Sequence, residues 1–357
     1  MKILAIETSC DETAIAIVEA GGVLKAPRFK ISKNLVSSQI AIHRPFGGVV
    51  PNLAKREHIK NLPIILGKIF GIYKSEFLVP KQIPKFKIQN IDIVAVTVGP
   101  GLEPALWTGV NFAKEICKQF KIQNSKIKII GVNHLEGHLY SFLLSKNYNL
   151  KPITYNLFPA IALIVSGGHT ILVLMKSLTD WRKIGETRDD AVGEAFDKVA
   201  RMLELPYPGG PEVERLAVKG DPNVIPFPRP MMNSKDYDFS FSGLKTSVLY
   251  YLRDNLKAKK EDVAASFQKA AIDVLVAKTM RAVREFGAKS VILSGGVAAN
   301  KCLRKELKVA SDKLSVNFLS ADKKFQTDNA VIIAVAAYIQ FLRKKKRVIR
   351  AQANLNL

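Results

Sequence analysis

Two histidines, His134 and His138, lie four residues apart in the segment His-Leu-Glu-Gly-His. On a helix this spacing puts both imidazoles on one face, about one turn apart. Such a pair can bind one transition-metal ion and leave positions for a carboxylate, for which Asp328 is the candidate, and for substrate or water. Surface helices carry such pairs by chance, so two solvent-facing or capping histidines remain an equal alternative on spacing alone.

The same pair raises the alternative of a zinc peptidase, whose motif is His-Glu-x-x-His on a helix. Here the glutamate, Glu136, is the second residue after His134 instead of the first. One residue along a helix turns the side chain by a further ~100°, away from the metal-binding face. This order therefore disfavours a metallopeptidase without excluding it.

Ser-Gly-Gly occurs twice, beginning at Ser166 and at Ser294, each time directly after an apolar run. Each run is typical of a buried strand that ends in a turn. Glycines there let backbone N–H groups approach an anion, so two such turns favour phosphate or nucleotide binding over plain turn formation. Near these turns, Asn300 is a candidate hydrogen-bond partner for a base or ribose. Asp197 is a candidate for ribose hydroxyls, with an ordinary surface carboxylate as the alternative.

Asp11 and Glu12 lie in a polar segment between two short apolar runs at the start of the chain. This pattern predicts a hairpin whose tip faces a ligand. The two carboxylates could steer an amine nucleophile or a second cation, although an aspartate in a turn is commonplace.

The bulk composition predicts two domains, since 357 residues exceed one ordinary core. Hydrophobic content of 48% and charged content of 24% are those of a globular protein. The formal net charge of +23 would attract a polyanion such as RNA, although a generally lysine-rich composition explains it equally well.

No targeting or membrane segment is expected. The apolar N-terminus is cut short by Glu7, and the apolar stretch after Asn329 is too short to cross a bilayer. The three cysteines are far apart, which fits a reducing, cytoplasmic compartment. The basic run from Arg343 to Arg347 could touch a membrane or nucleic acid, but a solvated helix end is the better interpretation.

Strands and helices are expected to alternate, which indicates a mixed α/β fold. The repeated unit of acidic hairpin, glycine turns and crossing helices predicts a duplicated fold that holds its ligand between two lobes. Strands are expected at residues 2–6, 14–18, 91–98, 127–132, 160–165, 171–175 and 290–294, and helices at 51–70 (kinked or restarted at Pro63), from 104, at about 190–203, 212–219 and 260–286, after 298, and from near Thr327, which would cap the last one.

Taken together, the tracts resemble one known family along nearly the whole chain. In order they are Ile-Glu-Thr-Ser-Cys-Asp-Glu-Thr (6–13), Gly-Gly-Val-Val-Pro (47–51), Val-Gly-Pro-Gly-Leu (98–102), His-Leu-Glu-Gly-His (134–138), Val-Ser-Gly-Gly-His-Thr (165–170), Gly-Glu-Ala-Phe-Asp-Lys (193–198), Pro-Gly-Gly-Pro (208–211), Phe-Ser-Phe-Ser-Gly-Leu-Lys-Thr (239–246), Ser-Gly-Gly-Val-Ala-Ala-Asn (294–300) and Thr-Asp-Asn-Ala (327–330). The chain closely resembles the TsaD family, the tRNA N6-adenosine threonylcarbamoyltransferases, in their bacterial form.

The resemblance implies a two-lobed actin-like ATPase fold of duplicated RNase H-like domains with a ligand cleft between them. The expected N-terminal lobe covers residues 1–131, with a C-terminal helix at about 327–345 packed back on it. The expected C-terminal lobe covers residues 132–326 and holds the metal and nucleotide sites.

The resemblance further implies transfer of a threonylcarbamoyl group from threonylcarbamoyl-AMP to N6 of the adenosine beside the anticodon, in tRNAs that read codons starting with A. His134, His138 and Asp328 would hold one divalent ion per subunit, Fe²⁺ in the first place and Zn²⁺ as the alternative. The residues that would bind the adenylate are Ile164, Val165, Ser166, Gly167, Gly168, Asp197, Gly210 and Asn300.

The implied partners are tRNA, a catalytically silent TsaB-like paralogue and a small TsaE-like ATPase. A different class of function also stays open, a non-catalytic actin-like module or scaffold. Such a scaffold would keep the glycine turns but would not need the two histidines and Asp328 to converge.

Overall fold

The computed structural model describes residues 1–71, 91–123, 126–145 and 157–357. The chain forms two compact units. The first comprises Met1–Pro152 and Asp328–Leu357, and the second comprises Ile153–Thr327. Residues 132–152, expected in the C-terminal lobe, thus belong to the first unit, and with them both histidines of the candidate metal site.

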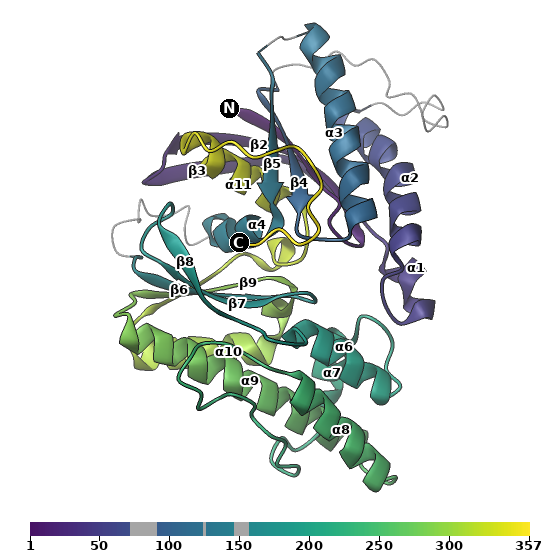
Figure 1. Ribbon diagram of the computed structural model, residues 1–357, viewed down its shortest axis with the longest axis vertical. Coiled ribbons are helices and arrows are strands. Elements are labelled where there is room, and N and C mark those ends of the chain that lie inside the picture. The colour runs from purple at the N-terminus through teal and green to yellow at the C-terminus, as the bar shows by residue number, and fades with distance from the viewer. Residues whose placement is uncertain (72–90, 124–125, 146–156) are drawn as a thin grey trace. The chain divides into compact units, whose positions relative to one another are not determined.

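The first unit is built on a five-stranded sheet in the order β3-β2-β1-β4-β5 (Figure 1). The strand β1 pairs antiparallel with β2 and parallel with β4, β2 pairs antiparallel with β3, and β4 pairs parallel with β5. The strands are β1 (Lys2–Glu7), β2 (Glu12–Val23), β3 (Ala26–Ser38), β4 (Ile93–Gly99) and β5 (Lys128–Asn133).

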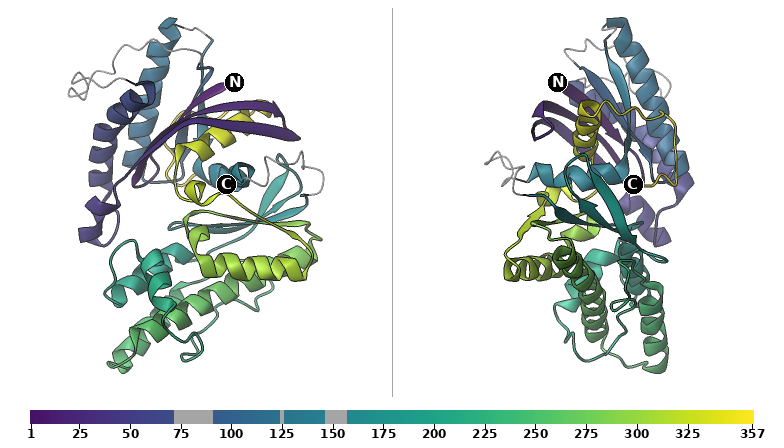
Figure 2. Two further views of the ribbon diagram at one scale, coloured as in Figure 1. Left: turned by 180° about the vertical axis from the view of Figure 1, so that it is seen from behind. Right: turned by 60° about the vertical axis from the view of Figure 1, so that its left-hand side comes forward.

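Helices cover both faces of this sheet, which explains why its central strands are continuously apolar. In β1, Leu4 and Ile6 pack with α2 (Pro51–Phe70) and α3 (Glu103–Gln123) in one core. The alternate residues Ile3 and Ala5 are also fully buried, on the face that α11 (Ala330–Leu342) contacts. Figure 2 shows α11 against the sheet from behind. The other elements of this unit are α1 (Ile40–His43), η1 (Arg44–Phe46), α4 (His134–Tyr140) and η3 (Ser141–Leu144).

The second unit repeats the topology, with a sheet in the order β10-β9-β6-β7-β8. Its first strand again pairs antiparallel with the next strand and parallel with β9. The elements are β6 (Ala160–Val165), β7 (Thr170–Met175), β8 (Trp181–Glu186), β9 (Ser290–Ser294), β10 (Asn317–Ser320), α6 (Val192–Met202), α7 (Gly209–Ala217), α8 (Ser242–Asp254), α9 (Lys260–Glu285), α10 (Lys301–Lys313), η4 (Gly296–Ala299) and η5 (Lys323–Phe325). The shared strand order confirms the duplication expected from the sequence.

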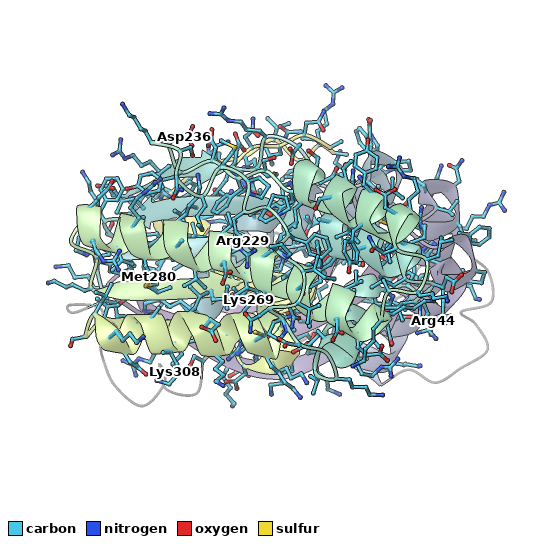
Figure 3. All side chains as sticks on the ribbon, turned by 90° about the horizontal axis from the view of Figure 1, so that it is seen from below. Arg44, Arg229, Asp236, Lys269, Met280 and Lys308 are labelled. Atoms are coloured by element: carbon cyan, nitrogen blue, oxygen red, sulfur yellow. The ribbon has the colours of Figure 1, made fainter. Side chains whose placement is uncertain are left out.

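Charged side chains line the helical layer of the second unit. Lys269 of α9 and Lys308 of α10, labelled in Figure 3, each pair with an aspartate four residues later, at 3.4 Å and 2.9 Å. Exposed pairs of this kind contribute little to stability, about 0.3–0.5 kcal/mol each.

Two local expectations differ from the structure. Pro63 lies inside the single helix α2, so of the two alternatives, a kink or a restart, the restart is wrong. The last helix begins at Ala330, and its cap is Asn329, whose side chain accepts hydrogen bonds from the N–H groups of Val331 and Ile332. Asparagine caps a helix at least as well as threonine. The observed cap therefore lies two residues after the expected one, Thr327. Among the described residues, no helix combines the length and the apolar character needed to cross a membrane.

Candidate metal centre and adenylate turns

The three candidate metal ligands meet at one point in the first unit. His134 is the first residue of α4, His138 lies one turn later, and Asp328 stands just before α11. The Nε2 atoms of the two histidines are 3.1 Å apart, and Oδ1 of Asp328 is 3.3 Å from His134 Nε2 and 3.1 Å from His138 Nε2. Both imidazoles are buried.

This geometry fits a single ion. Nitrogen and carboxylate ligands bind zinc-like ions at about 2.0–2.2 Å, so ligand atoms around one such ion lie roughly 3.0–3.5 Å apart. The three observed separations fall in that range. Two imidazoles with one carboxylate also match the donor preferences of Fe²⁺ and Zn²⁺. His134, His138 and Asp328 are therefore suited to hold one divalent ion.

Glu7 supports this triad from behind. Its carboxylate Oε2 lies 3.0 Å from His134 Nδ1 and accepts a hydrogen bond from Thr97 Oγ1 at 2.6 Å. The backbone N–H of Ser9 donates to the other oxygen, Oε1. Glu7 is fully buried. An acceptor at Nδ1 fixes the tautomer in which Nε2 presents its lone pair, as carboxylates do for metal-binding histidines in general.

Opposing effects set the pKa values in this cluster. Burial disfavours the charged form of His134, but the carboxylates of Asp328 and Glu7 raise its pKa well above the ordinary value. Burial alone would raise the pKa values of Glu7 and Asp328, but the charge and hydrogen bonds of His134 hold both below their ordinary values. Burial lowers the pKa of His138. The two carboxylates, one at each ring nitrogen of His134, thus favour a positive charge at this position.

Asp11 and Glu12 lie at the junction of β1 and β2, as the sequence predicts. Asp11 is buried, and its carbonyl accepts a hydrogen bond from the N–H of Gln39. Glu12 opens β2, and Ser38 Oγ lies 3.5 Å from its carboxylate. Burial, followed by the negative charges of Asp11 and Asp328, raises the pKa of Glu12 well above its ordinary value. The negative charge of Asp328 therefore acts on Glu12.

His58 anchors the hairpin tip that carries these acids. Its Nε2–H donates to the carbonyl of Cys10 at 2.9 Å, and its Nδ1 accepts from Thr13 Oγ1 at 2.8 Å. Both ring nitrogens are therefore used by the neutral imidazole. Burial lowers the pKa of His58 below the ordinary value of 6.5.

A pH dependence of stability follows from His58. Below about pH 6.5 the unfolded chain takes up a proton at this residue, whereas the folded chain stays neutral, so stability is full above that pH and falls as the pH decreases. His58→Gln retains a donor for Cys10 and removes the titration. Urea unfolding at about pH 7 and about pH 5 should therefore show a smaller loss of stability in the variant. Equal losses in the two proteins would contradict this assignment.

The turn at Ser166 joins β6 to β7 in the second unit, and Ile164 and Val165 are the buried last residues of β6. Ser166 Oγ accepts a hydrogen bond from His169 N at 3.1 Å, while Gly167 and Gly168 are exposed. A Cβ on either glycine would meet no atom within 4 Å. These two residues are thus accessible to a ligand through their backbone.

The other predicted adenylate residues have structural roles in the same unit. Asp197 Oδ1 accepts hydrogen bonds from the N–H groups of Gly209 and Gly210, at 2.7 and 3.3 Å, at the start of α7. Asn300 caps α10 by accepting from Leu303 N at 2.9 Å, and its Nδ2 donates to Gln268 at 2.8 Å. The side-chain amide of Asn300 is therefore engaged within the unit rather than presented to a base or ribose.

Comparison with known proteins then identifies the family. The family model described as tRNA N6-adenosine threonylcarbamoyltransferase, TsaD, matches residues 30–335. The chain belongs to the TsaD family. Proteins of that name from Thermosipho africanus and Thermosipho melanesiensis are 46% and 45% identical to it, over 95% and 100% of this chain and 94% and 100% of theirs. The homologue of the same name from Moorella thermoacetica is 46% identical, over 96% of this chain and 93% of its own.

Solved structures support the fold of this TsaD chain. HypF of T. kodakarensis superposes with a TM-score of 0.57 at 16% identity, over 96% of this chain and 48% of that one. A full-length HypF with phosphate and nucleotide bound also gives 0.57, at 13% identity, over 98% and 47%. At such identities the likeness concerns the fold alone. Together with the two matching sheets, it confirms the two-lobed actin-like ATPase fold.

Sequence reasoning missed the supporting residues of this TsaD site. Glu7 was named as the end of an apolar stretch and as part of the tract at 6–13, but with no role at the metal site, and Thr97 was given no role. Asn133, which caps α4 by accepting from Leu135 N and Glu136 N, was also missed. The cap had a recognisable signal, since asparagine directly before a helical histidine pair is a favoured N-cap. The partnership of Glu7 with His134, 127 residues away, had none.

The second glycine turn of this TsaD chain depends on Gly295. Its φ is +91°, and a Cβ there would lie 2.2 Å from the carbonyl oxygen of Val165. We expect Gly295→Ala to lower the free energy of unfolding by about 2 kcal/mol or more, from backbone strain and overlap together. Gly296→Ala is the matched control, because a Cβ on Gly296 meets nothing within 4 Å. Denaturant unfolding of both variants tests this; equal stabilities would refute the packing argument.

Proposed function

We propose that this chain transfers the threonylcarbamoyl group of threonylcarbamoyl-AMP to N6 of the adenosine 3′ of the anticodon, in tRNAs reading ANN codons, and releases AMP. Family membership over nearly the full length supports the reaction class. The observation that carries the proposal is the convergence of His134, His138 and Asp328 on one point within 3.3 Å of one another. This convergence argues against a metal-independent scaffold.

His134, His138 and Asp328 would hold one divalent ion, Fe²⁺ by preference and Zn²⁺ as the alternative. When bound, such an ion supplies Lewis acidity at the acyl group. Glu7 orients His134 through Nδ1. In the proposed step the adenosine N6 forms a bond to the acyl carbon while the bond from that carbon to the phosphate oxygen breaks. AMP leaves with the bonding electrons, and the N6 proton passes to a nearby carboxylate, for which Asp11 and Glu12 are the candidates.

The second unit would bind the adenylate. Ile164, Val165 and Ser166 set the turn, and the exposed backbone of Gly167 and Gly168 is suited to an anionic phosphate. In addition, we assign Asp197, Gly210 and Asn300 to this site, Asn300 through its backbone because its amide group is engaged. No protein nucleophile is needed, so positioning and charge stabilisation would supply the rate gain.

The net charge of +23 supports an RNA substrate. Because tRNA and the adenylate are the substrates, we propose that the protein acts in the cytoplasm. Its proposed partners are a TsaB-like paralogue and a TsaE-like ATPase, and no membrane takes part.

The test is mass spectrometry of tRNA nucleosides after incubation with threonine, bicarbonate, ATP, a synthase for the adenylate and the two accessory proteins. Threonylcarbamoyladenosine should form only when this chain is present. A tRNA carrying another base beside the anticodon serves as the matched control and should stay unmodified. Complete mixtures that leave the tRNA unmodified would refute the proposal, and cleavage of a protein substrate in a chelator-sensitive way would favour the peptidase alternative.

A further inference from the structure

The chain continues past α11 into residues 343–357, which we call the C-terminal strap. Figure 1 shows this segment running from α11 across β5 and β4 toward α4. Gln352 N donates to the carbonyl of Val98 at 2.7 Å, and Gly101 N donates to the carbonyl of Ala353 at 3.1 Å. At Gly99 a Cβ would lie 1.9 Å from the Gln352 oxygen, so the strand end has no room for a side chain there. The strap is therefore built into the first unit.

The strap also reaches the cap of the metal-binding helix. Asn133 uses Oδ1 to cap α4, and its Nδ2 donates to the carbonyl of Asn356 at 2.8 Å. One side chain thus joins the start of α4 to the end of the chain.

The third attachment is an ion pair between a residue of the strap and a residue of α4. Arg347 Nη2 lies 2.9 Å from Glu136 Oε1, and the two side chains are only 13% and 4% exposed. Lys345 adds a weaker contact to the same oxygen at 3.5 Å and is 42% exposed. Glu136 stands between His134 and His138 in the sequence, so this pair acts on the helix that carries both imidazoles.

Because α4 is short, its position depends on these attachments. It has seven residues, all buried, and a helix so short has little stability of its own. Its direction must therefore be fixed by the contacts around it. Removing the partner of a buried charge is also strongly unfavourable, so the Arg347–Glu136 pair restrains α4 more than an exposed pair would.

We propose that Arg347 is a positioning residue for the metal centre, which it holds in place through Glu136 as part of the C-terminal strap. Arg347 touches neither metal nor substrate in this role. It keeps His134 and His138 at the mutual geometry that one ion needs. The proposal rests on the metal role proposed above.

The test compares Arg347→Met with Arg350→Met, which removes the same charge from an exposed position of the strap. Co²⁺ alone is titrated into the metal-free proteins, with its visible absorption as the readout. We expect Arg347→Met to weaken Co²⁺ binding about tenfold, in the range seen for partners of metal ligands, and to alter the absorption bands. Hydrogen exchange of the metal-free protein should be faster in α4 only in Arg347→Met. Arg347→Lys should restore part of the affinity.

The results distinguish the positioning role of Arg347 from a failure of the metal site itself and from a role in RNA binding. If the wild-type protein binds no Co²⁺, the proposed metal site itself fails. If the wild type binds Co²⁺ and Arg347→Met binds it equally with unchanged bands, the metal site stands and the positioning role is overturned. A role in RNA binding would instead weaken tRNA binding to a similar degree in both variants while Co²⁺ affinity stays unchanged.

The double variant Glu136→Gln with Arg347→Met distinguishes a lost attachment from an unpaired buried charge. It removes both charges, so thermal stability should recover relative to Arg347→Met while Co²⁺ binding stays weak. Recovery of both properties would overturn the proposal, because the loss would then come from the unpaired carboxylate alone.

Discussion

Replacing His138 with alanine is expected to lower threonylcarbamoyl transfer by about a hundredfold or more and to abolish stoichiometric metal binding. In the proposed metal site the imidazole would supply one of three ligand atoms, and its Nε2 lies 3.1 Å from Asp328 Oδ1. Two remaining ligands would hold a divalent ion much more weakly, and the Lewis acidity that the ion would supply would be lost with it. Metal analysis by mass spectrometry and single-turnover transfer from the purified adenylate measure the two effects.

The fold must survive for the His138→Ala result to be informative. His138 is fully buried, so its truncation leaves space inside the first unit, and thermal unfolding of the metal-free proteins gives the necessary control. Adenylate binding should also persist, because the adenylate residues belong to the second unit. Full metal occupancy in a folded His138→Ala protein would disprove the ligand assignment.

The structure argues against Glu136 as the general base of a peptidase. A zinc peptidase needs a glutamate that reaches the metal-bound side of its helix. Glu136, the only acid between the two histidines, instead pairs with Arg347 at 2.9 Å and is nearly buried. The angular argument from the sequence disfavours peptidase chemistry, and the ion pair of Glu136 with Arg347 is a second argument against it.

Local patterns were sufficient for most of the fold. The strands β1, β4, β6 and β9 are buried on both faces. Their continuous apolar runs therefore predict them as strands without further information. The edge strand β3 was missed, because most of its residues alternate between exposed and partly buried and three of them, Arg28, Lys30 and Lys33, are basic. Charged edge strands are protected against further pairing and carry only a weak signal, the period-two alternation.

Site residues that are close in the sequence could be predicted, whereas contacts between residues far apart in the sequence could not. Four-residue spacing identifies His134 and His138 as a pair. Asp328 was also a candidate ligand, but it lies 190 residues from His138, and no spacing argument brings it to them. Arg347 stands in a basic run that composition assigns to solvent, yet its side chain is only 13% exposed and pairs with the buried carboxylate of Glu136. Which basic residue of such a run becomes buried depends on tertiary packing, and the hydrophobic periodicity of the sequence does not indicate it.

The substitution Glu7→Gln should weaken divalent-ion binding by about 10- to 100-fold and reduce transfer, although Glu7 is not one of the three proposed ligands. The carboxylate fixes His134 by accepting its Nδ1–H at 3.0 Å and contributes a negative charge that favours a nearby cation. Glutamine keeps the size and can still accept from Thr97, so the fold should persist while the charge is lost.

The matched control for Glu7→Gln is Thr97→Val, which removes the 2.6 Å hydrogen bond to the same oxygen and leaves the charge in place. It should weaken metal binding far less, because the ionic partner of His134 remains. Calorimetric titration of the metal-free proteins with Zn²⁺ gives the affinities directly. If Thr97→Val and Glu7→Gln were equally impaired, packing around the carboxylate would matter more than its charge. If neither were impaired, the contact of Glu7 with His134 would have no part in metal binding.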